Sequence, residues 1–458
     1  MRWLANLKRI SGLNRAIAFT VMARGWSTLA GVVTVLFIAR YLTAAEQGYY
    51  YTFSSLVALQ IIFELGLSFV ILQLAAHECA HLVVTLDGGI TGDLIAHSRL
   101  ASILQKAVRW YSCGAVLLVC TLLPIGFRFF GTHSSPGVAA VHWRGPWILA
   151  VLATTVTFQL DPVFSFIEGC GLVPQVARMR FTQAVLGSLL AWGALLIHHG
   201  LFAPSMTIIG QAIAGSLFLV HQRRLLLPLL SHSTRANFVS WGREIWPFQW
   251  RISISWLSGY LIFQLFNPVL FASRGPAEAG RMGMSLSIAS TLSAVALAWM
   301  NTKAAPFGTL VARRMFDALD RLFFRTLLQS LVLLAFGAMA LVFGLGYFER
   351  AVPVYAGRVL PVSIFGVLMA TVLCNHVVFC EAIYLRAHKR EPFLPVSVAV
   401  GILTAASTVL LGRTYGAVGM TYGYFCINGL FGLALGSTIF LRKRNRWHQE
   451  PDEKGVAI

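Results

Sequence analysis

The chain has 458 residues, of which 57% are hydrophobic and only 12% are charged, and its mean hydropathy is +0.72. Soluble domains are about 25% charged, so this composition excludes an ordinary soluble protein and predicts a chain solvated by lipid. The net charge of +19 does not indicate nucleic acid, because the basic residues lie in short segments between apolar runs, where they orient helices and attract anionic lipid head groups.

Twelve apolar segments are long enough to cross a membrane as helices, which takes about 20 residues each. They lie at about 16–39, 49–72, 107–130, 147–169, 175–198, 201–221, 246–272, 282–305, 326–348, 360–384, 393–411 and 416–441. We expect no cleavable signal peptide, because the first apolar run has full length and no small-residue cleavage site follows it.

The distribution of basic residues predicts the orientation of these spans. If both termini are cytoplasmic, 26 of the 36 basic residues lie on the cytoplasmic side and 8 on the opposite side. This asymmetry satisfies the positive-inside rule. We therefore expect both termini in the cytoplasm.

A tyrosine-rich hairpin connects the first two spans. Tyr49–Tyr51 follow the polar residues 43–48, and the second span then carries Glu64, Gly66 and Ser68 in the sequence FELGLS. This stretch resembles the start of the oligosaccharide flippases, which are the polysaccharide transporters of the multidrug/oligosaccharidyl-lipid/polysaccharide exporter superfamily. The resemblance implies a V-shaped, alternating-access transporter made of two six-helix bundles.

The cytoplasmic connection after the second span carries two features. Residues 91–105 begin with the helix-capping residues Thr91 and Asp93 and then place apolar residues among polar ones, which favours an amphipathic helix on the membrane surface. Before it, His77, Glu78 and His81 fit the H-E-x-x-H motif, in which two histidines bind zinc and the glutamate is a general base. A membrane zinc protease is the remote alternative, because this segment leaves a helix end instead of lying sealed within the spans.

The sequence also predicts an internal repeat. Residues 277–280 (AEAG) follow the seventh span as residues 45–48 (AEQG) follow the first, with an offset of 232. A second repeated pattern relates Phe166–Glu168 at the end of the fourth span to Phe379–Glu381 at the end of the tenth. Two six-helix halves in the same orientation are a parallel repeat, a plan used by many transporters. We expect an N-terminal bundle at 1–222, a cytoplasmic connector at 223–245, a C-terminal bundle at 246–441 and a basic cytoplasmic tail at 442–458.

Several charged residues lie inside or near the spans, where charge is costly and marks either a helix-pairing contact or a hydrated cavity. A cationic cavity suits a diphosphate or an anionic sugar, and carboxylates suit coupling to H⁺ or Na⁺. The candidates for substrate binding are Arg24, Lys303 and Arg251. The candidates for ion coupling are Glu64, Asp161, Glu168 and Glu381.

These observations predict an all-α polytopic membrane protein with no cofactor and no enzymatic activity, since the sequence has no nucleotide-binding or hydrolase motif. The resemblance implies a protein of the bacterial inner membrane whose substrate is a polyprenyl-diphosphate-linked oligosaccharide used for O-antigen, capsule or exopolysaccharide. It also implies that membrane lipids and polysaccharide polymerase machinery are its partners. The alternatives are a multidrug and toxin extrusion-type antiporter and a lipid II-type flippase. A purely structural membrane scaffold fits less well with paired halves that carry buried charges.

Overall fold

The computed structural model describes residues 2–84, 89–133, 141–231, 239–351, 357–388 and 390–449, with backbone alone for residues 2–17, 84, 243, 247, 248, 251, 305 and 348. Within these ranges ten helical segments are long and apolar enough to cross a membrane, and the bent pair Ala44–Glu64 and Leu67–Cys79 is an eleventh. One of the ten, Leu394–Gln449, has 56 residues, a length of about 84 Å. Because Gly416 interrupts it with a φ of 62° and a ψ of −146°, it divides into two spans. The prediction of twelve spans is confirmed with this division.

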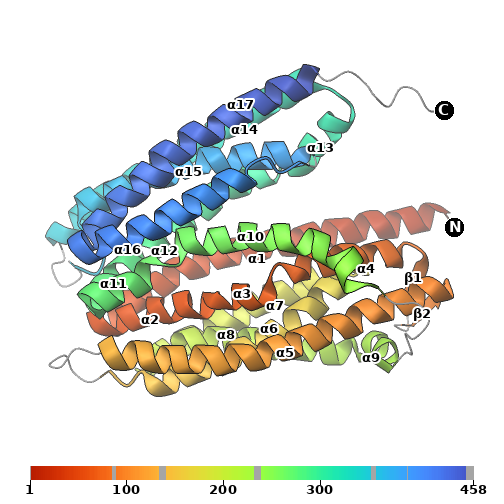
Figure 1. Ribbon diagram of the computed structural model, residues 1–458, viewed down its shortest axis with the longest axis horizontal. Coiled ribbons are helices and arrows are strands. Elements are labelled where there is room, and N and C mark those ends of the chain that lie inside the picture. Colours follow the sequence, from red (N-terminus) through yellow and green to blue (C-terminus); the bar gives the residue numbers. More distant parts are fainter. Residues whose placement is uncertain are drawn as a thin grey trace. The chain divides into compact units, whose positions relative to one another are not determined.

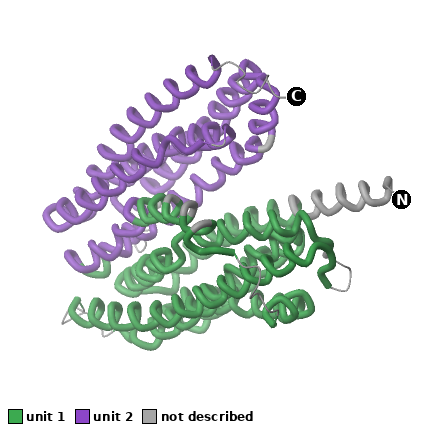
Figure 2. Tube along the Cα trace, turned by 45° about the vertical axis from the view of Figure 1, so that its right-hand side comes forward, with its two compact units in different colours: residues 1–260, 275–277 green, residues 261–274, 278–458 purple. Residues whose placement is uncertain are grey.

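The chain forms two compact units, which Figure 2 shows in different colours. Unit 1 contains Met1–Tyr260 and Gly275–Ala277, and unit 2 contains Leu261–Arg274 and Glu278–Ile458. The division falls inside the predicted seventh span, because Ser253 and Tyr260 donate hydrogen bonds to the backbone of the second span, at Leu65 and Ser55.

The elements of the first part of the chain, up to residue 263, can be followed in Figure 1. They are α1 (Arg2–Tyr41), α2 (Ala44–Val57), α3 (Ile61–Glu64), α4 (Leu67–Cys79), β1 (Leu82–Val84), β2 (Ile90–Gly92), α5 (Leu94–His133), α6 (Arg144–Gly169), α7 (Val173–Leu196), α8 (Ala203–His221), α9 (Arg223–Ser231) and α10 (Trp246–Phe263). The two strands form an antiparallel hairpin in which Val83 pairs with Thr91.

The elements of the remaining part follow in the same figure. They are α11 (Phe266–Arg274), α12 (Pro276–Asn301), α13 (Ala304–Ala312), α14 (Phe316–Ala351), α15 (Val362–Ala387), α16 (Leu394–Tyr424) and α17 (Leu433–Gln449). A π-helical segment, Phe425–Gly432, joins α16 to α17.

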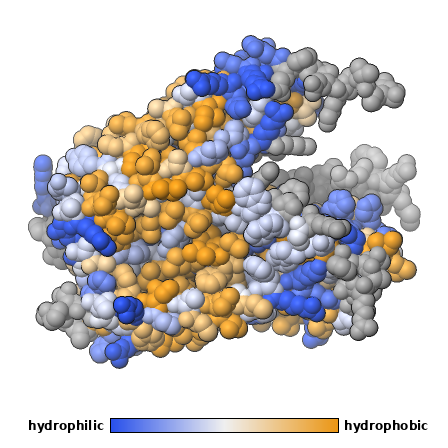
Figure 3. All heavy atoms as spheres, in the orientation of Figure 1, coloured by the Kyte–Doolittle hydropathy of each residue, from blue (hydrophilic) through white to orange (hydrophobic). Residues whose placement is uncertain are grey.

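Each unit has its own aromatic core. In unit 1 the rings of Phe53 and Phe130 pack against Trp147 with centroid distances of 5.4 and 5.6 Å. In unit 2 the ring of Phe323 packs against Tyr384 and Phe440 at 5.0 and 5.4 Å. On the face drawn in Figure 3, hydrophobic side chains cover the middle of the helices and hydrophilic ones gather at helix ends, as expected for helices that lie in lipid.

The amphipathic segment 91–105 is not a separate surface helix, which corrects the sequence-based expectation. Asp93 caps a helix by accepting a hydrogen bond from the Ala96 amide at 3.1 Å, and this helix, α5, continues to His133 without a break. Its 40 residues span about 60 Å, about twice the hydrocarbon thickness. In its first turn Leu94 and Ile95 are exposed, whereas Leu100, Ile103 and Leu104 in the turns that follow are buried against protein.

Candidate functional site

The second span is broken near its middle. α3 ends at Glu64, Leu65 and Gly66 both have left-handed backbone conformations with φ of 50° and 66°, and α4 begins at Leu67. The two halves of the span are bent by 46°. A leucine rarely adopts a positive φ, so tertiary contacts must hold this conformation in place.

Contacts from two other helices satisfy the backbone at the break. The hydroxyl of Ser253 on α10 donates to the carbonyl oxygen of Leu65 at 2.8 Å. The indole N–H of Trp110 on α5 donates to the carbonyl oxygen of Phe63 at 3.4 Å. An irregular backbone at membrane depth is tolerated where protein or water satisfies its polar groups, so this break is a built feature of unit 1.

Two carboxylates lie close to the break. Glu64 interacts with the hydroxyl of Ser68, which also hydrogen-bonds the hydroxyl of the fully buried Tyr111 at 2.8 Å. Asp161 on α6 is close enough to Glu64 for an electrostatic interaction. Glu64 is half-buried and Asp161 is exposed. The structure therefore brings together two of the predicted ion-coupling residues, with hydroxyl groups beside them.

A third candidate, Glu168, has a different environment. Its carboxylate accepts a hydrogen bond from the guanidinium of Arg180 at 2.9 Å, across the hairpin that joins α6 to α7. Arg180 also interacts electrostatically with Asp161. No local pattern in the sequence shows that Arg180 lies beside these carboxylates.

Arg24 is exposed on α1, and within the described ranges it forms no ion pair. The next tryptophan, Trp26, lies about 200° around the helix from Arg24 and donates a hydrogen bond to Ser188 on α7 at 3.0 Å. Arg24 therefore lies on the face of α1 that points away from α7.

Of the two other candidates for substrate binding, the structure describes the side chain of Lys303 but not that of Arg251. Lys303 is half-buried at the N-cap position of α13 in unit 2, where the helical path breaks between α12 and α13.

Glu381 is the most buried of the four acidic candidates, with 4% of its surface exposed. It lies on α15, and one carboxylate oxygen accepts a hydrogen bond from the Ser437 hydroxyl on α17 at 2.8 Å. The other oxygen, Oε2, has no hydrogen-bond partner among the described residues. Because buried carboxylates without a partner are costly, this oxygen is suited to receive a proton or a cation.

Within the described residues, His77, Glu78 and His81 are not arranged as a zinc site. The carboxylate of Glu78 is engaged by the Arg99 guanidinium at 2.8 Å and is buried, whereas the His77 side chain is 77% exposed. Arg99 also pairs with Glu244. In the described residues no group of three or more His, Cys, Asp or Glu side chains is arranged to hold a metal ion; Asp87 lies outside them. The geometry thus gives the motif a structural explanation.

No protein-family model matches the sequence, and no curated protein matches it either. Solved structures do match. An inward-facing multidrug resistance MATE family transporter of the MOP superfamily aligns over 92% of this chain and 98% of its own, with 12% identity and a TM-score of 0.61.

Two further structures show the range of proteins with this architecture. The MATE multidrug transporter DinF-BH, in a ligand complex, aligns over 95% of this chain and 97% of its own, with 14% identity and a TM-score of 0.56. The lipid II flippase MurJ in an inward closed conformation aligns over 94% and 90%, with 13% identity and a TM-score of 0.54. The chain therefore has the fold of the MOP-superfamily transporters. The oligosaccharide flippase family within that superfamily stays a prediction.

Proposed function

We propose that this chain is an alternating-access flippase that moves a polyprenyl-diphosphate-linked oligosaccharide across the bacterial inner membrane, from the cytoplasm to the periplasm. The observation that carries the proposal is Arg24, an exposed guanidinium in an apolar span that forms no ion pair in the described structure. A guanidinium keeps its proton and binds phosphate oxygens in a bidentate manner. A diphosphate is the ligand that best matches this group.

In this proposal Lys303 and Arg251 are further contacts for the diphosphate or for anionic sugars. Glu64 and Asp161 form the cation-coupling site of unit 1, and Glu381 forms that of unit 2. The break at Leu65 and Gly66 supports this role for Glu64, because discontinuous spans commonly supply ion sites in transporters. Glu168 holds the α6–α7 hairpin through Arg180.

The test is a flipping assay with the purified protein in liposomes, using a fluorescent polyprenyl-diphosphate oligosaccharide and a quencher that does not cross the membrane. Arg24→Ala should slow flipping about thirtyfold, since removing one partner of a charged hydrogen-bonded pair costs at least about 2 kcal/mol. Arg24→Lys should be intermediate, because it keeps the charge but loses the bidentate geometry.

The matched control is Arg128→Ala, which removes another exposed arginine, near the end of α5; this variant should flip at the wild-type rate. Thermal melting shows whether each variant is folded. A stable Arg24→Ala protein with full activity would remove the phosphate-binding role.

A second candidate function is a multidrug and toxin extrusion-type antiporter. The observation that favours it is the pair of carboxylates Glu64 and Asp161 in unit 1, because acidic groups bind organic cations as well as coupling ions. Cation-dependent efflux of a fluorescent organic cation from the same liposomes, with no flipping of the lipid-linked oligosaccharide, would establish this alternative instead.

A further inference from the structure

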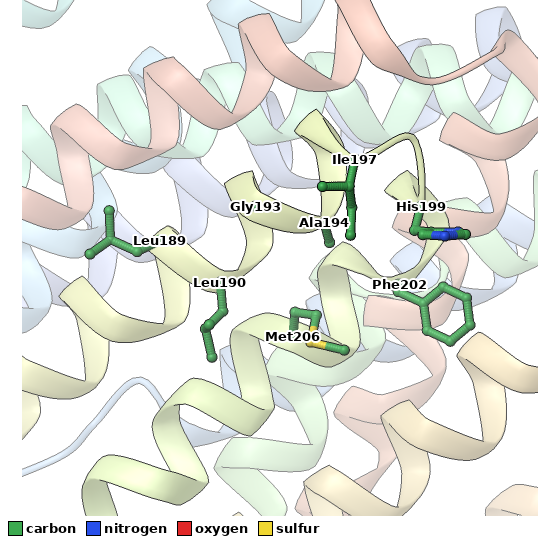
Figure 4. A pocket seen from close by; sticks show the side chains of 8 residues that line it. All are labelled: Leu189, Leu190, Gly193, Ala194, Ile197, His199, Phe202 and Met206. Atoms are coloured by element: carbon green, nitrogen blue, oxygen red, sulfur yellow. The ribbon is translucent and has the colours of Figure 1, made fainter.

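An apolar groove of about 540 Å³ lies between α7 and α8 of unit 1, a volume in the range of small-molecule sites. Figure 4 shows Leu189 and Leu190 at one end of it and His199 and Phe202 at the other, with Gly193 and Met206 between them. The two helices touch closely at Gly187 and Gly210, where a Cβ added to Gly210 would lie 2.7 Å from the Cα of Gly187. Beyond this contact, toward the α7–α8 hairpin, they leave the groove between them.

The groove is open to the outer surface of unit 1. Two side chains on its wall, Leu189 and Ile197, are 49% and 66% exposed. Since these helices are membrane spans by length and composition, the molecules that meet this surface are lipid chains.

The hairpin end of the groove is basic. His199 is exposed there, and its ring contacts the ring of Phe202 with a centroid distance of 6.2 Å. Phe202 adjoins the first turn of α6, because a Cβ added to Gly145 would lie 3.6 Å from its ring. The neighbouring Arg144 is exposed at the N-terminus of α6, which itself favours an anion. Residues 173–221, which form both walls, contain no Asp or Glu.

We propose that this groove binds a membrane phospholipid with an anionic head group, independently of the transported substrate. One acyl chain lies between α7 and α8, and the phosphate lies at the hairpin end near His199 and Arg144. The apolar groove matches the acyl chain of a phospholipid, and the basic groups at its end match the phosphate. A second copy of this chain would fit less well, because it would bring its own basic residues to the same end.

Native mass spectrometry of the full-length protein, titrated with dioleoylphosphatidylglycerol and separately with dioleoylphosphatidylcholine, tests the proposal. The wild type should bind one phosphatidylglycerol in preference to phosphatidylcholine. Gly193→Leu should fill the groove, since no atom lies within 4 Å of a Cβ at this position. The leucine side chain should exclude about two methylene groups of the acyl chain from the groove and so weaken the binding of both lipids about tenfold.

Two further variants separate the chain site from the head-group site. Gly344→Leu is the matched control, because Gly344 is also a half-buried glycine inside a helix with open space around it; it should bind lipid like the wild type. Arg144→Gln combined with His199→Gln should bind both lipids equally, because the basic end is lost while the groove stays open.

Three results would overturn the proposal. Unchanged lipid binding by Gly193→Leu, at a wild-type melting temperature, would show that no chain occupies the groove. Equal binding of both lipids by the wild type would show that the head group is not recognised. A change from dimer to monomer in Gly193→Leu, without a change in lipid binding, would assign the groove to a second copy.

Discussion

The acidic residues inside the spans differ in what surrounds their carboxylates. Glu168 accepts a hydrogen bond from Arg180, so its charge is already balanced. Glu64 interacts electrostatically with another carboxylate, Asp161, on which Arg180 also acts, and one oxygen of Glu381 has no hydrogen-bond partner in the described structure. Uncompensated charge inside a membrane protein is costly and is kept for a function. We therefore expect Glu168 to stabilise helix pairing, and Glu64, Asp161 and Glu381 to bind and release a cation.

Amide variants test this separation. Glu64→Gln and Asp161→Asn should abolish the dependence of transport on a proton or Na⁺ gradient, because an amide neither carries the charge nor takes up the proton. Their expression and melting temperature should stay near those of the wild type. Transport in liposomes with imposed gradients is the measurement.

Glu168→Gln is the control for these variants. It removes a carboxylate of the same type but leaves Glu64 and Asp161 in place, so gradient dependence should persist. Its melting temperature should fall slightly, as expected for a partly exposed ion pair worth less than about 1 kcal/mol. If Glu64→Gln and Asp161→Asn both keep the wild-type response to both gradients, the coupling group of this protein lies elsewhere.

The two histidines of the H-E-x-x-H motif should have no metal-dependent role. His77→Ala combined with His81→Ala should leave transport unchanged, because Glu78 between them is held by Arg99. Metal analysis of the purified protein should find less than one zinc per chain. One zinc per chain that disappears in the double variant would restore the protease interpretation.

At the scale of elements, the break in the second span depends on one glycine. Gly66 has a φ of +66°, and a Cβ added to it would lie 2.4 Å from Cγ2 of Ile252 on α10. Gly66→Ala should therefore destabilise unit 1 by about 1–3 kcal/mol, from backbone strain and steric conflict together. It should also impair transport, because the substitution shifts Glu64 or α10.

Gly344→Ala is the matched comparison for that substitution. This glycine lies inside α14 with no atom within 4 Å of a Cβ, so alanine should stabilise the helix by up to about 1 kcal/mol. Melting temperatures of the two variants in one detergent should move in opposite directions. A Gly66→Ala protein as stable and active as the wild type would show that the break is not required.

The length of each apolar segment predicts the spans, because it is a local property of the sequence. The break within the second span and the contacts between spans are not predictable from such a local property. The sequence places a glycine at 66, yet the left-handed Leu65 beside it is held by Ser253, 188 residues away. In the same way, no sequence pattern predicts that Arg180 interacts with both Glu168 and Asp161. Partners that meet only in the folded protein leave no local pattern in one sequence.

At the scale of the whole molecule, the structure supports an internal repeat. α2 begins at Ala44 and α12 at Pro276, which reproduces the offset of 232 found in the sequence. Glu46 and Glu278 both lie in the first turns of these helices. Glu46 caps its own helix with Thr43, whereas Glu278 accepts the Ala417 amide at 2.6 Å. The position of the glutamate is therefore repeated, and its partner differs between the two halves.

The second repeated pattern, Phe166–Glu168 and Phe379–Glu381, does not have equivalent positions on its two helices. Glu168 lies one residue before the end of α6, whereas Glu381 lies well inside α15, which ends at Ala387. The carboxylate of Glu168 is paired with Arg180, whereas that of Glu381 has no arginine partner among the residues that the structure describes. A shared sequence pattern at two helices therefore does not imply a shared role.

The orientation of the chain in the membrane is the last prediction, and it depends on the asymmetry of basic residues between the two sides. Reporter fusions after Gly131, Gly200 and Gly275 should be periplasmic, and a fusion after Arg446 should be cytoplasmic, because basic loops are retained on the cytoplasmic side. Alkaline phosphatase and green fluorescent protein give opposite signals at each site, so each fusion controls the other. With a cytoplasmic N-terminus, a periplasmic C-terminus would require an odd number of spans and would contradict the division of Leu394–Gln449 at Gly416.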